Sequence, residues 1–313
     1  MAEGQLIFRE DASTQILNAV SLDLKEGAFA EAMGLLEALL ERDISSPGAA
    51  SALKSAAFWR EREESGRAPS DPFERGEWLL AQWRLFQAFA ERLGDVPEAC
   101  MFAIKRFVFS SALDSYLEAA GPDGGSDPDV LLQLGRCCKG IGNYERAIDC
   151  LERANRERRD FPAILAELAD CYSLVNEARA AKVFFREAFF IDPQAVDLEA
   201  LESPMITRLA ARLRGNGFGG PELAEWIPVY GAIWGVFSVK REMKPLELGK
   251  LKQSIFQLEK DRPRQRQLLP RLLTRYFWLI DHYLMAGEQR QRIDEVLERI
   301  RELDPGVHAE YTT

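Results

Sequence analysis

Histidine is scarce in this chain of 313 residues, which contains only His282 and His308. Neither has a second histidine nearby, and no Cys-x-x-Cys pair occurs in the sequence. Because structural zinc sites usually draw four ligands from closely spaced cysteines and histidines, we expect no metal site and no cofactor. His282 follows an aromatic-rich helical pattern, where a packed or half-exposed imidazole is the expected state.

A disulfide framework is also lacking. The five cysteines are an odd number, and Cys137 and Cys138 are adjacent, whereas disulfide scaffolds usually contain an even number at regular spacings. All five lie in helical patterns at positions suited to a small apolar residue. We therefore expect reduced thiols in a cytoplasmic protein. No local signature pairs a cysteine with a histidine as a nucleophile, so we expect no catalytic residues and no enzyme.

Long apolar runs are absent as well. The longest, residues 226–239, spans 14 positions, and a membrane-spanning helix needs roughly 20. Residues 1–11 lack a basic stretch followed by an apolar one, so we expect no secretory signal. The run at 226–239 is better explained as a buried helix.

Positive charge is in deficit, since 40 Lys and Arg residues face 50 Asp and Glu residues, for a net charge of −10. This balance argues against a general nucleic-acid binder, which is usually basic. The glycine cluster at 215–220 follows no strand pattern and lacks a Gly-Lys-Ser/Thr ending. It therefore predicts a linker and not a phosphate loop.

Against these absences stands a repeat with an offset of 34 residues. Aligning residues 128–161 with 162–195 places like residues together: Leu131 with Leu165, Leu134 with Leu168, Gly135 with Ala169, Cys138 with Tyr172, Ala147 with Ala181, Leu151 with Phe185 and Ala154 with Ala188. Apolar residues three and four apart form one stripe of a helix. The small residues predict positions where two helices approach closely, because a larger side chain there would overpack.

This pattern resembles the tetratricopeptide repeat (TPR), a 34-residue pair of helices. Residues 162–195 match the family pattern through to Pro193, whereas in 128–161 Cys138 replaces the aromatic residue and Arg159 stands where proline is expected. The resemblance implies an all-α, TPR-like α-solenoid of antiparallel helix pairs. It also implies a scaffold or adaptor that binds a peptide or helix of another protein.

Because two repeats alone rarely bury their apolar faces, we expect degenerate terminal repeats at 13–46, 93–126 and 274–307. Further helices are expected at 49–62, 73–92, 245–260 and 264–286. The predicted organisation is a helical array at 1–195, a linker at 196–220 and a C-terminal helical region at 221–313. The break either separates two domains or bends one superhelix.

The resemblance places the partner-binding surface on the concave face, which is lined by the first helix of each repeat. The residues carried over to that face are Gln133, Arg136, Lys139, Glu167, Asp170 and Ser173. Glu167 and Asp170 would repel the C-terminal carboxylate that chaperone-binding members of the family hold. A chaperone tail is therefore not the expected ligand.

Basic residues gather in 240–275, which carries a charge of +7 and leaves −17 for the remaining residues. One interpretation is a docking surface for an acidic partner or for nucleic acid. The other is internal packing against the acidic N-terminal half of the chain. The candidate surface residues are Lys250, Lys252, Arg264, Arg266, Arg271 and Arg275.

Overall fold

The computed structural model describes residues 2–121, 125–240, 243–262 and 265–313. These residues form fifteen α-helices and three short 3-10 helices, and none of them lies in a strand. The all-α class predicted from the sequence is confirmed. The chain divides into two compact units, Met1–Cys150 (unit 1) and Leu151–Thr313 (unit 2), and the division falls inside α7.

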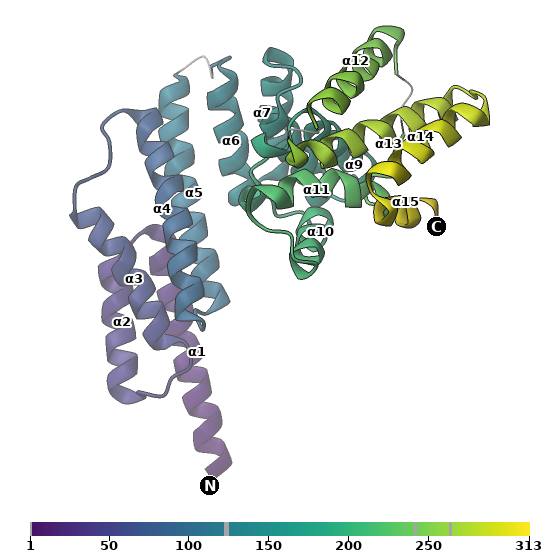
Figure 1. Cartoon of the computed structure of the whole chain (residues 1–313). Helices are drawn as coiled ribbons and strands as arrows, with labels where there is room; N and C mark the ends of the chain where they lie inside the picture. Colours follow the sequence, from purple (N-terminus) through teal and green to yellow (C-terminus); the bar gives the residue numbers. More distant parts are fainter. Residues whose placement is uncertain (1, 122–124, 241–242, 263–264) are drawn as a thin grey trace. The chain divides into compact units, whose positions relative to one another are not determined.

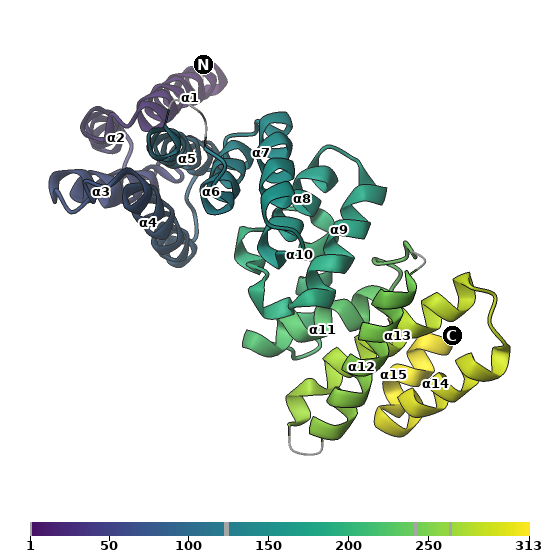
Figure 2. The same cartoon turned by 90° about the horizontal axis from the view of Figure 1, so that it is seen from above.

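Unit 1 is built from long helices that pack as neighbours (Figures 1 and 2). Packed pairs are α1 with α2, α2 with α3, and α4 with α5, while α5 also packs against α1 and α6. The helices of this unit are α1 (Ala2–Glu26), α2 (Phe29–Arg42), α3 (Ala49–Glu64), α4 (Pro72–Leu93), α5 (Glu98–Ala120), α6 (Pro128–Gly140) and the first half of α7 (Tyr144–Glu157).

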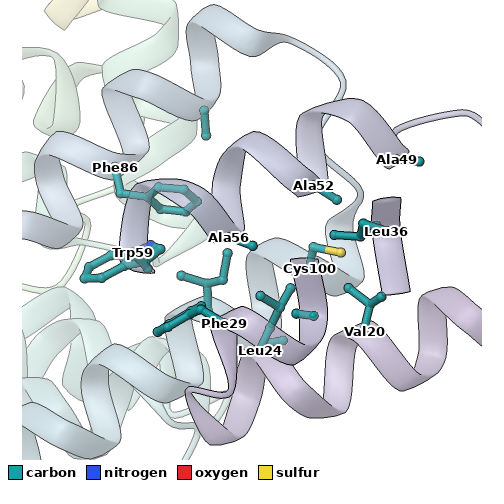
Figure 3. Close-up of a cluster of buried hydrophobic side chains, with 14 of the residues drawn as sticks. Val20, Leu24, Phe29, Leu36, Ala49, Ala52, Ala56, Trp59, Phe86 and Cys100 are labelled. Atoms are coloured by element: carbon teal, nitrogen blue, oxygen red, sulfur yellow. The ribbon is translucent and has the colours of Figure 1, made fainter. Parts of the chain in front are cut away.

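The unit 1 core is closed by side chains from several helices. Leu24, Phe29, Ala56 and Cys100 come from four different helices and point into one interior (Figure 3). Aromatic rings fill much of it: the Trp59 ring lies 5.6 Å from the Phe86 ring, edge to face. Such aromatic pairs contribute about 0.5–1.5 kcal/mol beyond the area that they bury.

Unit 2 continues with shorter helices and a similar pairing. The pairs α8–α9, α10–α11, α12–α13, α13–α14 and α14–α15 are in contact, and α11 also packs against α13. Its helices are α8 (Pro162–Leu174), α9 (Ala178–Ile191), η1 (Pro193–Ala195), η2 (Leu198–Ala200), α10 (Pro204–Gly215), α11 (Gly220–Ile233), α12 (Pro245–Asp261), η3 (Arg266–Leu268), α13 (Leu269–Met285), α14 (Arg290–Leu303) and α15 (Pro305–Thr312). Consecutive helices thus pack pairwise within each unit, as in a TPR-like α-solenoid.

The 34-residue offset is reproduced in the helix boundaries. Helices α6 and α8 begin at Pro128 and Pro162, and α7 and α9 begin at Tyr144 and Ala178. The turn repeats too: Gly142 and Asn176 both have left-handed backbones, with φ of 84° and 64°. In each turn the next amide donates back to the preceding helix at 2.8 Å, as at helix ends closed by a left-handed residue.

The small residues of the repeat lie where the spacing predicts. Ala147, Ala169 and Ala181 have no exposed surface, and Gly135 is buried. Ala188 and Phe185 on α9 are also fully buried. Close approach of the helices is therefore the reason for the small side chains at these positions.

The degenerate repeat predicted at 93–126 is wrong, because most of this stretch forms the single helix α5 (Glu98–Ala120). No glycine or proline interrupts residues 98–120, so nothing ends the helix between Ala103 and Ala112. Both alanines are buried, but they contribute to one continuous helix. The pair in this region is α4 with α5.

The linker predicted at 196–220 is also wrong as a description of that segment. It contains η2 and α10, and Ile206, Leu209 and Leu213 bury one side of α10 at spacings of three and four residues. Only residues 216–219 lie outside a helix after α10, and Gly217 there has a φ of 93°. The compact units divide within α7 and not at this glycine cluster.

The other two degenerate units correspond to helix pairs, α1 with α2 at 13–46 and α13 with α14 at 274–307. Leu284 is an exception, since half of its surface is exposed (51%) although the pattern placed it in the core. Val296 is buried on α14. Among the helices of the described segments, none is both long and apolar enough to span a bilayer.

Candidate functional site

The residues predicted to line a partner-binding face are for the most part not on an exposed surface. Lys139 on α6 is only 4% exposed, and Glu167 and Asp170 on α8 are 1% and 0% exposed. The expectation that these three side chains face a partner is therefore wrong. The reason is that α8 is covered nearly all round, with residues 164–171 all buried.

Asp170 instead holds the segment that leads into α10. Its carboxylate accepts the Ser203 amide at 2.7 Å and the Glu202 amide at 3.0 and 3.1 Å. Ser203 Oγ donates to Ser173 Oγ at 2.7 Å and caps α10 by accepting the Met205 amide. Two of the predicted groove residues thus support the fold of unit 2.

Gln133 on α6 is likewise engaged inside unit 1. Its Nε2 donates to Glu77 Oε1 at 2.6 Å, and the same oxygen accepts the Tyr116 hydroxyl at 2.6 Å. This contact ties α6 to α4 and α5. Arg136 is half-buried on the same helix.

The basic segment is divided between internal contacts and exposed positions. Arg271 on α13 holds Glu225 with both Nε and Nη2, at 2.6 to 3.0 Å, and Asp192 at 2.8 Å. Lys240 lies 2.9 Å from Asp281, which also pairs with the buried Arg186. Internal packing therefore accounts for part of the positive charge. Its partners lie within unit 2, so the prediction that the segment packs against the acidic N-terminal half is wrong for these residues.

Arg275 is also turned inward. Its Nε donates to Ser254 Oγ at 2.7 Å and its Nη1 to the Arg271 carbonyl at 3.1 Å, and its guanidinium lies 5.1 Å from the Phe190 ring. Burial and the neighbouring Arg271 charge lower the pKa of Arg275 to about 10. Arg271 and Arg275 are thus positioned as structural residues and not as a free basic patch.

Two lysines of the segment, Lys250 and Lys252 on α12, are exposed. Lys252 Nζ lies 5.9 Å from the Tyr283 ring. Arg264 and the side chain of Arg266 lie outside the described residues. Within the described part of 240–275, most of the exposed basic residues therefore lie on α12.

A cleft of about 1010 Å³ opens in unit 2 between η1, the start of α11, η3 and the start of α13. Its volume suits a small ligand or a short stretch of peptide. The lining residues are Gln194, Gly219, Pro221, Glu222, Glu225, Trp226, Gln267, Leu268, Leu269, Pro270 and Arg271. No sequence pattern indicated this cleft, because the residues before Pro221 have the composition of a linker.

The polar groups on one wall of the cleft are fixed by one another. Arg271 holds Glu225, and Gln194 Nε2 donates to Glu225 Oε1 at 2.9 Å and to the Pro221 carbonyl at 2.8 Å. This wall joins α11, α13 and η1. Since its charges are paired, the surface that it presents is stiff and close to neutral.

Apolar side chains form most of the remaining lining, and Leu268 and Leu269 among them are half-buried. Two polar residues, Glu222 and Gln267, are exposed. Trp226 is backed by the Phe218 and Tyr230 rings at 5.3 and 5.7 Å. An apolar surface with a few fixed polar groups is typical of sites that bind a ligand in a defined orientation.

Comparison with known families identifies one region, since the tetratricopeptide repeat family model matches residues 128–161. These are the residues of α6 and α7, the helix pair whose turn and boundaries recur 34 residues later. The chain contains a tetratricopeptide repeat. The match covers 128–161, the unit in which Cys138 and Arg159 replace the aromatic residue and the proline of the family pattern. The TPR-like unit 162–195 has the same helix boundaries, 34 residues later. No curated protein matches the chain.

A tetratricopeptide repeat suggests in general terms a role in protein–protein interaction. The first element that lines the cleft, η1, follows the second TPR-like pair, α8–α9, in the sequence. Gln194 of η1 is one of the lining residues.

Proposed function

We propose that this TPR protein is a scaffold or adaptor that binds a peptide or helix of a partner protein, and that the unit 2 cleft is its main contact surface. The observation that carries the proposal is the TPR at 128–161, together with pairwise packing of the helices in both units. Helix pairs of this kind present side chains from successive helices to an extended ligand.

The chemistry of the cleft supports a peptide as the ligand. Leu268, Leu269 and Trp226 offer apolar surface, while Gln267 and Glu222 at the exposed rim can accept or donate hydrogen bonds to a main chain. Each buried methylene of a ligand side chain would contribute about 0.8 kcal/mol. Because the Arg271–Glu225–Gln194 wall is already paired, binding would need little reordering of that wall.

The proposal includes no catalytic step and places the protein in the cytoplasm. All five cysteines are buried and outside disulfide bonds, which suits reduced structural thiols better than a nucleophile or a secreted disulfide scaffold.

Affinity capture of the tagged full chain from its source cell, followed by mass spectrometry, tests the proposal. The informative variant is Glu222→Lys, which reverses a charge at the rim in the first turn of α11. Its matched control is Glu98→Lys, which makes the same change in the first turn of α5. Each change removes a carboxylate that interacts favourably with the positive end of a helix dipole. The loss of this interaction costs about 0.3–1 kcal/mol of stability in either variant.

The expected result is a discrete set of captured proteins that is weakened by Glu222→Lys and retained by Glu98→Lys. Equal capture by both variants would remove the cleft from the proposal, and capture of nothing by the wild-type chain would contradict the scaffold role itself.

A further inference from the structure

The outer face of α12 is an exposed surface that neither the cleft nor the core uses. On one side, Leu251 and Ile255 are buried as α12 packs against α13. On the other side, Leu246 and Phe256 are 72% and 68% exposed. These are large apolar side chains to leave in water, where burial of each could contribute about 1.5–3 kcal/mol.

Lysines share this face with the apolar side chains. With 100° of rotation per residue, Leu246, Lys250, Phe256 and Lys260 lie within an arc of roughly 120°. The structure describes all four as exposed. The two lysines are ten residues apart, and so are the two apolar residues; ten residues span about 15 Å along a helix.

The carboxylates of α12 do not neutralise these lysines. Glu247 accepts the Lys244 amide at 2.8 Å at the start of the helix, and Glu259 accepts the Tyr276 hydroxyl of α13. Asp261, at the last residue of the helix, accepts Gln257 Nε2 at 3.0 Å. Within the described residues, Lys250 and Lys260 have no carboxylate at ion-pair distance.

We propose that this face of α12 docks an acidic amphipathic helix of a partner protein. A helix laid along α12 has the same rise per residue, so its leucines and glutamates can meet the apolar side chains and the lysines at matching intervals. None of these four α12 residues lines the cleft, so the α12 proposal does not depend on the cleft.

The pattern favours a protein helix over other acidic partners. A nucleic acid would pair with Lys250 and Lys260 but leave Leu246 in water, since phosphate contacts need no aliphatic surface. A bilayer requires a continuous apolar stripe, whereas Gly249 and Gln253 separate the two apolar side chains of α12.

The test uses a fluorescent designed peptide of about five helical turns, with leucines along one side and glutamates flanking them. Binding to the full chain is measured by fluorescence anisotropy. Saturable binding is expected, about tenfold weaker for the Lys250→Glu/Lys260→Glu double variant, because like charges then face each other. Phe256→Ala is also expected to weaken it, whereas a scrambled peptide of the same composition should bind at least about tenfold more weakly than the designed one.

Lys25→Glu/Lys54→Glu is the matched control, since it makes the same charge change at two exposed lysines of unit 1. It should leave the affinity unchanged, as should Glu222→Lys in the cleft. The proposal is overturned if the wild-type chain does not bind, if the control pair weakens binding equally, or if the scrambled peptide binds as well.

Two further results would reassign the surface. Loss of peptide binding in Glu222→Lys but not in Lys250→Glu/Lys260→Glu would move the peptide to the cleft, so that the α12 proposal fails while the proposed function survives. Binding of an RNA oligonucleotide or of phosphatidylserine vesicles that needs Lys250 and Lys260, without binding of the peptide, would also overturn the proposal.

Discussion

Replacing Asp170 with alanine is expected to destabilise unit 2, because this fully buried carboxylate holds two backbone amides at the entrance to α10. The amides of Glu202 and Ser203 donate to it at 2.7 to 3.1 Å. Neither amide belongs to a helical hydrogen-bond ladder, since both precede Pro204, the first residue of α10. Without the carboxylate, the amide of the buried Ser203 would lose this hydrogen bond away from water, whereas the amide of Glu202 belongs to an exposed residue.

The magnitude follows from the two hydrogen bonds. A hydrogen bond to a charged group contributes about 1.5–3 kcal/mol, and a buried donor left without a partner costs about 1–3 kcal/mol. The two bonds share one carboxylate and do not add fully, and removing a buried charge recovers part of its desolvation cost. We therefore expect Asp170→Ala to lower the free energy of unfolding by about 2–4 kcal/mol. Asp170→Asn keeps one acceptor oxygen and should lose about half of that.

Urea denaturation gives the global value, and hydrogen exchange followed by mass spectrometry over residues 198–206 gives the local one. The Glu202 and Ser203 amides should exchange faster in Asp170→Ala. The control is Asp149→Ala, an exposed aspartate of α7, which should change stability by less than about 0.5 kcal/mol. If Asp170→Ala is as stable as the control and its amides exchange at the wild-type rate, the assignment of Asp170 as an internal support is refuted.

Three other outcomes follow from the same structure. Ala181→Leu should lower the free energy of unfolding by about 1–3 kcal/mol in urea denaturation, because Ala181 has no exposed surface; an unchanged value would mean that α9 makes no close contact there. Gly76→Ala should cost a similar amount by thermal denaturation, since the added Cβ would lie 2.5 Å from Tyr116 Cζ, and wild-type stability would disprove the contact. Burial and the hydrogen bond to Glu152 raise the pKa of Tyr172 to about 12. Since the folded state then keeps its phenol proton when the unfolded state has lost it, stability should fall as pH rises from 10 towards 12. This decline should be smaller in Tyr172→Phe, and an identical pH profile for both proteins would refute it.

The repeat could be predicted because its determinants are local. Leu165, Ala169 and Tyr172 fall on one helical stripe, and the Gly142 turn marks where one helix ends. In 93–126 the small residues alone led to the wrong prediction of a helix pair, since Ala103 and Ala112 also suit one long helix packed against its neighbours. The missing breaker between them was the signal that could have corrected the prediction.

The candidate site could not be predicted from local patterns, because its contacts join residues far apart in the sequence. Nothing near Asp170 indicates that Glu202 and Ser203 will cover it, and Arg271 meets Glu225 from 46 positions away. Charged residues on a predicted helix are usually assigned to the solvated face, and Lys139 and Glu167 depart from that rule. The cleft likewise depends on η1 and η3, two short turns without a periodic pattern.

Site-specific photo-crosslinking in the source cell tests most directly whether the chain binds a partner through the unit 2 cleft. A cross-linking amino acid replaces Gln267, which is exposed at the rim, or Gln291, which is exposed on α14 outside the cleft. We predict a discrete adduct with a second protein from position 267 and none from position 291. The same adduct from both positions, or none from position 267, would contradict the account.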